Sequence, residues 1–175
     1  MKLAIIIVAS IIGVIVVAIL LIALVGSFLP IKHSATRSVL LHQKVETVYA
    51  VVRDFESMPQ WRTDVRNVKV TNDPNGRVRF REEGKNGFVN YELIGEVPWQ
   101  SMVTRIIDTD LGYAGKWTYT FSEEGSSTRV TITENGEVSN VIFRFLSRYA
   151  FGHTATIDAY LTALGKHFGE IVQPQ

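Results

Sequence analysis

The chain has 175 residues, a formal net charge of +1 and no cysteine. The lack of cysteine excludes a disulfide scaffold, a thiolate metal site and a lipidated cysteine anchor. Charges of both signs are mixed along the chain, with no basic run and no zinc-finger spacing, which argues against a nucleic-acid partner.

The N-terminal stretch Leu3–Leu29 carries no charge and consists almost wholly of Ile, Val, Leu and Ala. A membrane-spanning helix needs about 20 such residues. A cleaved signal peptide would have a shorter apolar core, of about 7–15 residues, followed by a small-x-small site. A buried core helix is disfavoured because nothing along the stretch is polar enough to face water. We therefore expect a single-pass membrane anchor over residues 1–30, with Pro30 at its exit, and a linker over residues 31–37.

Basic residues on the two sides of this stretch bear on its orientation. Lys2 and the α-amino group lie on one side, whereas Lys32, Arg37 and Lys44 lie on the other. The positive-inside rule counts basic residues near the ends of a span, so it favours a C-terminal domain in the cytoplasm. An anchor led by a single lysine can also insert the other way, which leaves the second orientation open.

The segment after the anchor predicts a strand and a short helix. Arg37–His42 reads as the first strand, and apolar residues at steps of three and four predict an amphipathic helix over Val45–Asp54. Ser57-Met58-Pro59 ends this helical segment, because the residue before a proline disfavours the α region. A tight turn or a second small helix over Gln60–Asp64, which contains Trp61, follows.

Period-two alternation with turn residues every 8–12 positions then predicts an antiparallel meander with one buried face. Since successive strand residues point to opposite faces, only one of Glu82 and Glu83 can point inward. Most of the other strand carboxylates are expected to form solvated ion pairs on the outer face. The expected strands are Val65–Thr71, Arg77–Glu83, Phe88–Val97, Ser101–Asp108, Lys116–Glu123 and Thr128–Val138.

The last apolar pattern, from Val141 to Ile171, recurs at steps of three and four and predicts a helix. A straight helix of this length would measure roughly 45 Å, which is too long for one small domain. Gly152 is the expected break. The sequence thus predicts a short helix over Val141–Phe151 and a main helix over His153–Ile171, around which the sheet wraps.

The order of these elements and several local sequences resemble a known superfamily. The residues that carry the likeness are Val48–Asp54 with Pro59-Gln60-Trp61, Glu82-Glu83, Gly115–Thr118 and Thr131–Glu134. Over about Ser38 to Gly169 the chain resembles the START-like helix-grip superfamily (SRPBCC, polyketide cyclase/dehydrase-like). The resemblance implies an α+β domain over residues 38–172, with a curved antiparallel sheet of about six or seven strands around a long C-terminal helix. That family includes lipid and hormone binders, cyclases, hydrolase activators and stress proteins, so the fold alone does not choose a function.

Sequence motifs of the common catalytic classes are missing. There is no Gly-x-Ser-x-Gly, no Gly-x-Gly-x-x-Gly, no phosphate loop and no His-Glu-x-x-His. The four histidines are scattered, so we expect no metal site and no cofactor, and catalytic residues are unassigned.

Glu134 and His153 are polar residues expected on buried faces. Counting by twos from Ile132 puts Glu134 on the inner face of its strand, where a carboxylate needs a partner. Arg62, Arg79 or His153 could provide one. His153 lies on the apolar stripe of the last helix. It is either a neutral core histidine or a polar group facing a cavity, where a shifted pKa could support proton transfer.

Several aromatic residues with polar tips, held inside a curved sheet, suit a mostly apolar pocket with a few polar groups. Others among the aromatic residues are expected to form ordinary core. In this cavity we expect Glu134 as a buried polar anchor and Phe143 near the entrance. The predicted lining residues are Trp61, Tyr91, Trp117, Tyr149 and His153.

Three functions fit this reading. The first is a membrane-anchored, non-enzymatic binding protein that holds a hydrophobic small molecule, such as a lipid or an isoprenoid-like compound. The second is an enzyme of the cyclase/dehydratase type that uses Glu134 or His153 for acid–base chemistry in the same cavity. The third is an interaction domain with a filled core and no ligand.

Overall fold

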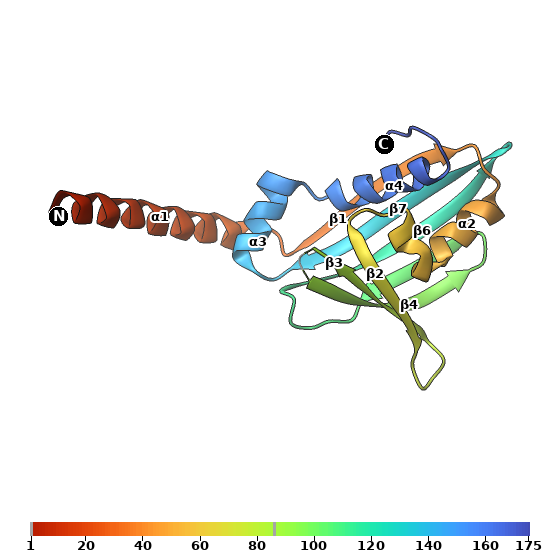
Figure 1. Cartoon of the computed structure of the whole chain (residues 1–175), viewed down its shortest axis with the longest axis horizontal. Coiled ribbons are helices and arrows are strands. Elements are labelled where there is room, and N and C mark those ends of the chain that lie inside the picture. Colours follow the sequence, from red (N-terminus) through yellow and green to blue (C-terminus); the bar gives the residue numbers. More distant parts are fainter. Residues whose placement is uncertain (1, 86) are drawn as a thin grey trace.

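A computed structural model describes residues 2–85 and 87–175 of the chain. Helix α1 (Lys2–Phe28) projects from an α+β domain formed by the rest of the chain (Figure 1). In the domain, a curved sheet wraps around the last helix, α4 (Ala155–His167), as predicted for a helix-grip fold. The N-terminal helix is long and apolar enough to cross a membrane, as far as length and composition can tell.

The seven strands formed by the described residues make one antiparallel sheet in the order β1-β7-β6-β5-β4-β3-β2. Each strand between β2 and β7 pairs with its neighbour in sequence, as expected of a meander. Bulges in β2 and in β4 shift the register and add to the local bend. The strands are β1 (Lys32–Leu41), β2 (Val65–Asn72), β3 (Val78–Gly84), β4 (Gly87–Val97), β5 (Ser101–Ile106), β6 (Tyr113–Glu124) and β7 (Ser127–Val138).

The first strand is longer than the sequence predicts. It begins at Lys32 rather than Arg37, so most of the expected linker over residues 31–37 is part of the sheet. Its added residues pair with the end of β7, where Lys32 lies opposite Glu137 and His33 opposite Gly136. The sequence there is mostly polar, so it does not resemble a strand, because only alternate residues of a strand need to be apolar to face the interior.

Two short helical elements close the sheet on one side. Helix α2 (Val45–Arg53) buries the apolar face predicted for it, and the 3₁₀ turn η1 (Phe55–Gln60) follows directly. The Tyr49 hydroxyl on α2 donates a hydrogen bond to Glu96 at the end of β4. Asp54 caps η1 through the backbone N–H of Ser57.

The C-terminal helical segment breaks at Gly152 as predicted, where φ is +75°. Before the break lie α3 (Val141–Leu146) and a π-helical turn, η2 (Ser147–Phe151). Helix α4 is shorter than the expected His153–Ile171, because Gly169 adopts a left-handed conformation (φ +73°) that ends the helical run. The tail beyond it returns along β1, and Gln175 exchanges two backbone hydrogen bonds with Ser38.

Candidate ligand cavity

The domain encloses a cavity of about 580 Å³ between the inner face of the sheet and the C-terminal helical segment. The lining residues that are buried mark its floor, and those that are exposed mark its mouth. The floor includes Arg62, Phe80, Thr104 and Tyr119, and the half-buried Glu82 lies beside Arg62 there. The mouth includes Tyr113, Glu137, Phe143, Gly152 and Thr156. The mouth therefore lies at the end of the domain that carries α3, which is the left-hand end in Figure 1.

An ion pair forms the polar part of the floor. Arg62 follows η1, and its guanidinium donates to Glu82 on β3 at 2.9 Å and to Asp64 at 2.7 Å. The Arg62 and Glu82 side chains are only 9% and 14% exposed. Glu82, rather than Glu83, is thus the inward-pointing member of its pair. Burial raises the pKa of Glu82, while the Arg62 guanidinium acts in the opposite direction.

Aromatic side chains make up much of the wall. Tyr91 stacks on Phe80 with ring centroids 5.0 Å apart, and Trp117 lies 6.0 Å from Tyr119. Burial raises the pKa of Tyr91 and of Tyr119 above the ordinary value, so these phenols stay neutral. The wall therefore offers apolar ring faces and neutral hydroxyl groups.

A second polar cluster lies nearer the mouth and is centred on Glu134. One carboxylate oxygen accepts a hydrogen bond from the Trp117 indole at 2.9 Å, and the other lies 3.2 Å from Nε2 of His33. Glu134 thus points inward and has partners, but they differ from the candidates expected from the sequence. Arg62 pairs with Glu82 instead, and Arg79 lies on the outer face of the sheet.

A glycine makes room for the His33 ring in this cluster. A Cβ atom at Gly136 would lie 2.3 Å from Cε1 of His33 and 3.1 Å from a carboxylate oxygen of Glu134. These separations are shorter than van der Waals contact, so a side chain at position 136 would displace the imidazole from the carboxylate.

His153 stacks on His33 with ring centroids 4.2 Å apart. Its pKa is lowered by burial, and the nearby His33 and Arg148 act in the same direction, whereas Glu134 opposes them. The lowered pKa favours the neutral ring, which can accept a proton.

The structure brings together five of the seven residues predicted for the cavity and separates the other two. Trp61 is buried behind the floor, where its ring meets Tyr160 edge-on at 5.2 Å. Tyr149 is 62% exposed and packs on Phe145. The five that lie at the cavity are Tyr91, Trp117, Glu134, Phe143 and His153.

The π-helical turn explains the outward position of Tyr149. Its i→i+5 hydrogen bonds hold more residues per turn than an α-helix, so a stripe counted at 3.6 residues rotates away from the domain. The position of Trp61 differs from the predicted one for another reason. It follows η1 beneath the C-terminal end of α4, where it also lies 6.2 Å from His167, and this is far from the mouth.

The polar lining residues that sequence reasoning missed include three members of the two polar clusters, namely His33, Arg62 and Glu82. His33 was assigned to the linker, and Arg62 with Glu82 could not be recognised as a pair because β3 begins more than ten residues after η1. Counting by twos along the strand from the core residue Ala35 predicts that His33 faces inward. Among the described residues, no three His, Asp or Glu side chains gather in a way that could hold a metal ion.

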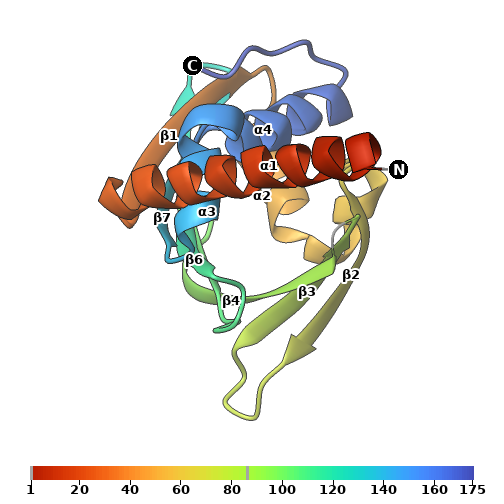
Figure 2. The same cartoon turned by 90° about the vertical axis from the view of Figure 1, so that its left-hand side faces the viewer.

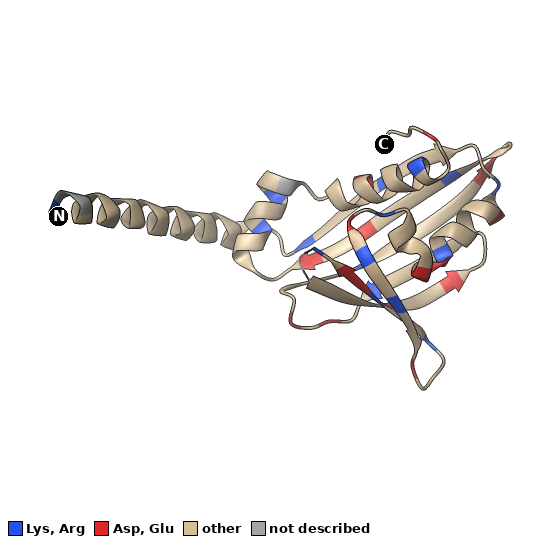
Figure 3. Ribbon diagram, viewed as in Figure 1, with Lys and Arg blue, Asp and Glu red and all other residues tan. Residues whose placement is uncertain are grey.

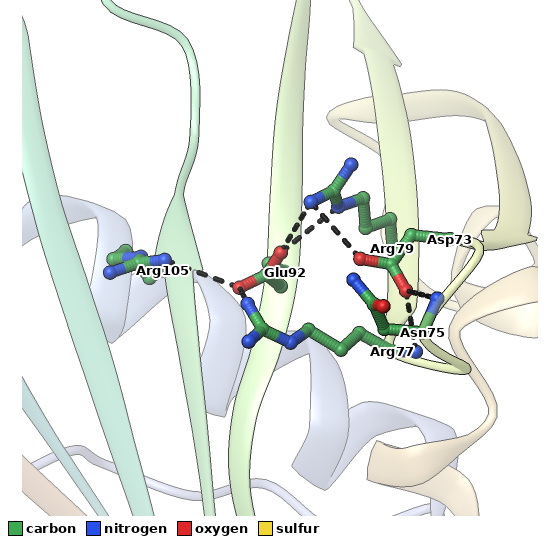
Figure 4. A network of polar contacts seen from close by, with 6 residues as sticks. All are labelled: Asp73, Asn75, Arg77, Arg79, Glu92 and Arg105. Atoms are coloured by element: carbon green, nitrogen blue, oxygen red, sulfur yellow. Dashed lines mark hydrogen bonds and ion pairs between the residues drawn. The ribbon is translucent and has the colours of Figure 1, made fainter.

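The outer face of the sheet carries a separate polar network (Figure 4). Glu92 on β4 is buried there and accepts from Arg79 at 2.9 Å, Arg105 at 3.2 Å and Arg77 at 3.5 Å. Hydrogen bonding from Arg79 is the main cause that lowers the pKa of Glu92. Asp73 holds the adjoining turn by accepting from the backbone N–H groups of Asn75 and Arg77. These charges satisfy one another, and the hollow of about 640 Å³ beside them is open to solvent.

Comparison with known families gives a match over most of the chain. The family model described as polyketide cyclase/dehydrase and lipid transport matches residues 32–168. No curated protein matches the sequence at a significant level.

Solved structures share the fold at low sequence identity. A START superfamily protein from Mycobacterium smegmatis is 17% identical with a TM-score of 0.60, over 77% of this chain and 96% of that one. A truncated norcoclaurine synthase from Thalictrum flavum is 11% identical with a TM-score of 0.62, over 78% of this chain and 93% of that one. The di-domain ARO/CYC StfQ from the steffimycin biosynthetic pathway is 10% identical with a TM-score of 0.62, over 79% of this chain and 52% of that one. At these identities the likeness shows the fold alone.

Proposed function

This chain belongs to the polyketide cyclase/dehydrase and lipid transport family, and we propose that it is a membrane-anchored protein that holds a lipid-like molecule in its cavity. The observation that carries the proposal is the cavity of about 580 Å³, which opens at one end of the domain. Sites for small molecules commonly measure about 300–1,000 Å³ and combine apolar walls with a few fixed polar groups.

The polar groups of the cavity indicate the chemistry of the ligand. Arg62 is already neutralised by Glu82 and Asp64, and Glu134 is engaged by Trp117 and His33. In both clusters the charged side chains already have ion-pair or hydrogen-bond partners within the protein. We therefore favour a mostly apolar molecule with neutral polar groups, such as a hydroxyl or a carbonyl, over a strongly charged one.

The anchor is proposed from α1. The part of it suited to a span, Ile5–Phe28, is 24 residues long, which corresponds to about 36 Å of helix against the ~30 Å of a hydrocarbon core. Figure 3 shows no charged residue along α1 after its N-terminal end, and most of its described side chains are exposed rather than packed in the domain. The excess of basic residues after the helix favours a cytoplasmic domain.

Membrane attachment has a direct test. Carbonate washing of membranes should leave the full-length chain in the pellet, because a span of this length is not released by breaking electrostatic contacts. A truncated chain that begins at Lys32, where β1 starts, should be soluble. Release of the full-length chain by the wash, or a mature N-terminus near Phe28, would contradict the anchor.

Ligand binding is tested on the truncated chain. We expect an uncharged apolar dye such as Nile red, or a monoacylglycerol, to raise the melting temperature with concentration, since a ligand that binds only the folded state stabilises it by RT ln(1 + [L]/Kd). Ile106→Trp, at a half-buried lining position, should abolish the shift. The matched control is Ala150→Trp, which adds the same side chain at an exposed position of η2. An unchanged melting temperature with every ligand would favour the ligand-free interaction domain.

A second candidate function is favoured by the cluster near the mouth. Glu134, His33 and the stacked His153 form a carboxylate–imidazole arrangement that could move protons in a cyclase or dehydratase reaction. Mass spectrometry of a ligand extracted from the purified protein separates the two functions. Recovery of the molecule unchanged after it is returned to the protein supports binding, whereas conversion lost in Glu134→Gln supports the enzyme.

A further inference from the structure

We propose that the segment Val141–Gly152, defined here as the mouth segment, lies in the interfacial layer of the bilayer that holds α1, so that the cavity opens toward the lipid. The inference rests on the proposed function, in that α1 must span a membrane. It adds a surface, a partner and a route for the ligand.

The first support is a buried arginine that joins the mouth segment to the end of α1. The Arg144 guanidinium donates to the backbone carbonyls of Gly26 at 3.2 Å and Leu29 at 3.0 Å. It also donates to Val138 and Ser139, at 3.0 Å each. One side chain thus satisfies carbonyls at the C-terminal end of α1, where the helix dipole favours a cation, and ties them to the end of β7.

Close backbone packing provides the second support. A Cβ atom at Gly26 would lie 2.0 Å from the carbonyl oxygen of Val141, so glycine is what allows α1 to approach the first residue of α3. Figure 2 views this end of the domain and shows α1 passing across α3. The mouth segment is therefore held against the last turn of the apolar helix, at the depth where a span leaves the hydrocarbon.

The third support is what the mouth segment exposes. Phe143 and Tyr149 are 50% and 62% exposed, Ile142 is also exposed, and Arg148 lies next to Tyr149. Exposed aromatic and aliphatic side chains beside a basic residue are typical of surfaces in the membrane interface, where an arginine can extend toward the headgroups. Phe28, the last residue of α1, and Ile31, just before β1, are exposed apolar residues as well.

The cavity mouth lies beside this surface, which gives the ligand a route between the cavity and the bilayer. Phe143, Gly152 and His153 line the cavity, and two of them are exposed. An apolar molecule that passes between cavity and bilayer beside these residues would avoid crossing water. A bilayer is the favoured partner, rather than a protein, because the bilayer that α1 spans already lies next to the mouth segment.

The experiment uses the full-length chain in phosphatidylcholine vesicles, and the lack of native cysteine makes single-site labelling clean. An environment-sensitive fluorophore is attached at Phe143→Cys or Tyr149→Cys, and quenching is measured with lipids that carry a doxyl group near the headgroup end of the acyl chain. The matched control is Ile171→Cys, which replaces a fully exposed apolar residue in the tail that follows α4. Figure 1 shows α1 projecting from the opposite side of the domain to the end of α4. We expect strong quenching at positions 143 and 149 and little at 171.

Equal, weak quenching at all three positions, in a chain that stays in the carbonate-washed pellet, would overturn the inference and leave the anchor intact. Protection of the labels from aqueous iodide without quenching by the lipids would also overturn it, because a second protein copy would then cover the surface. Arg144→Met in the Phe143→Cys background should reduce the quenching, since the tie to Gly26 and Leu29 is lost. If that variant does not fold, the labels in the otherwise native chain still decide the question.

Discussion

Replacing Trp117 with alanine should lower the free energy of unfolding by about 3–5 kcal/mol, the range found for large aromatics removed from protein interiors. The indole meets Tyr160 of α4 edge-on, with ring centroids 5.7 Å apart, and donates its N–H to Glu134 at 2.9 Å. The substitution removes the contact between sheet and helix and leaves the Glu134 carboxylate with one partner fewer. Urea unfolding of the truncated chain, followed by circular dichroism, measures the loss.

Trp99→Ala is the control for this measurement. Trp99 lies between β4 and β5 and is 55% exposed, so its removal should cost less than about 1 kcal/mol, as at other surface sites. A Trp117→Ala loss as small as that of the control would show that Trp117 does not join the sheet to α4. Trp117→Phe should fall between the two, because it keeps a ring but loses the donor to Glu134.

Replacing Arg62 with methionine is the second change for which we expect a large effect, a loss of about 3–5 kcal/mol. The variant leaves Glu82 in the cavity floor without the guanidinium that lies 2.9 Å from it, and an unpaired buried carboxylate is costly. The same urea unfolding measures this loss. Because a neutral Glu82 is then favoured, the variant should regain part of the stability at acidic pH.

The double variant Arg62→Met/Glu82→Leu separates the pair from the packing around it. Replacing a buried ion pair with apolar residues of similar volume is often neutral or stabilising, so the double variant should be more stable than Arg62→Met alone. If the two variants are equally destabilised, the role of Arg62 lies in its packing over the Tyr160 ring, 5.2 Å away, and not in its charge.

The sequence predicts those features of the fold that local patterns encode. Alternation along β6 and β7 places Trp117 and Glu134 on the inner face, and the structure agrees. Gly152 marks the break between the helices for a local reason as well, since its φ is positive. Such features depend on neighbouring residues only, and the family resemblance supplies the order in which they pack.

Local sequence patterns do not predict which residues pair with the polar side chains of the cavity. Glu134 is paired with His33, which is 101 positions away in the sequence. Their contact depends on the register between β1 and β7 and on the absence of a side chain at Gly136. The outward position of Tyr149 depends on a π-helical turn, for which the segment contains no recognisable sequence signal. Contacts over long sequence distances and irregular turns therefore limit the prediction of the cavity more than residue type does.

The pairing of the first strand with the last has a consequence for biosynthesis. Lys32 lies opposite Glu137, and Leu41 opposite Thr128, so the strand that pairs with β1 is the last-made strand of the sheet. A ribosome that adds about 5–20 residues per second exposes α1 and β1 several seconds before β7 exists. The sheet cannot close in that interval, because the long loop must form before β1 gains a neighbour. On the proposed anchoring, the helix enters the bilayer first, and the domain then matures while already tethered at the membrane surface.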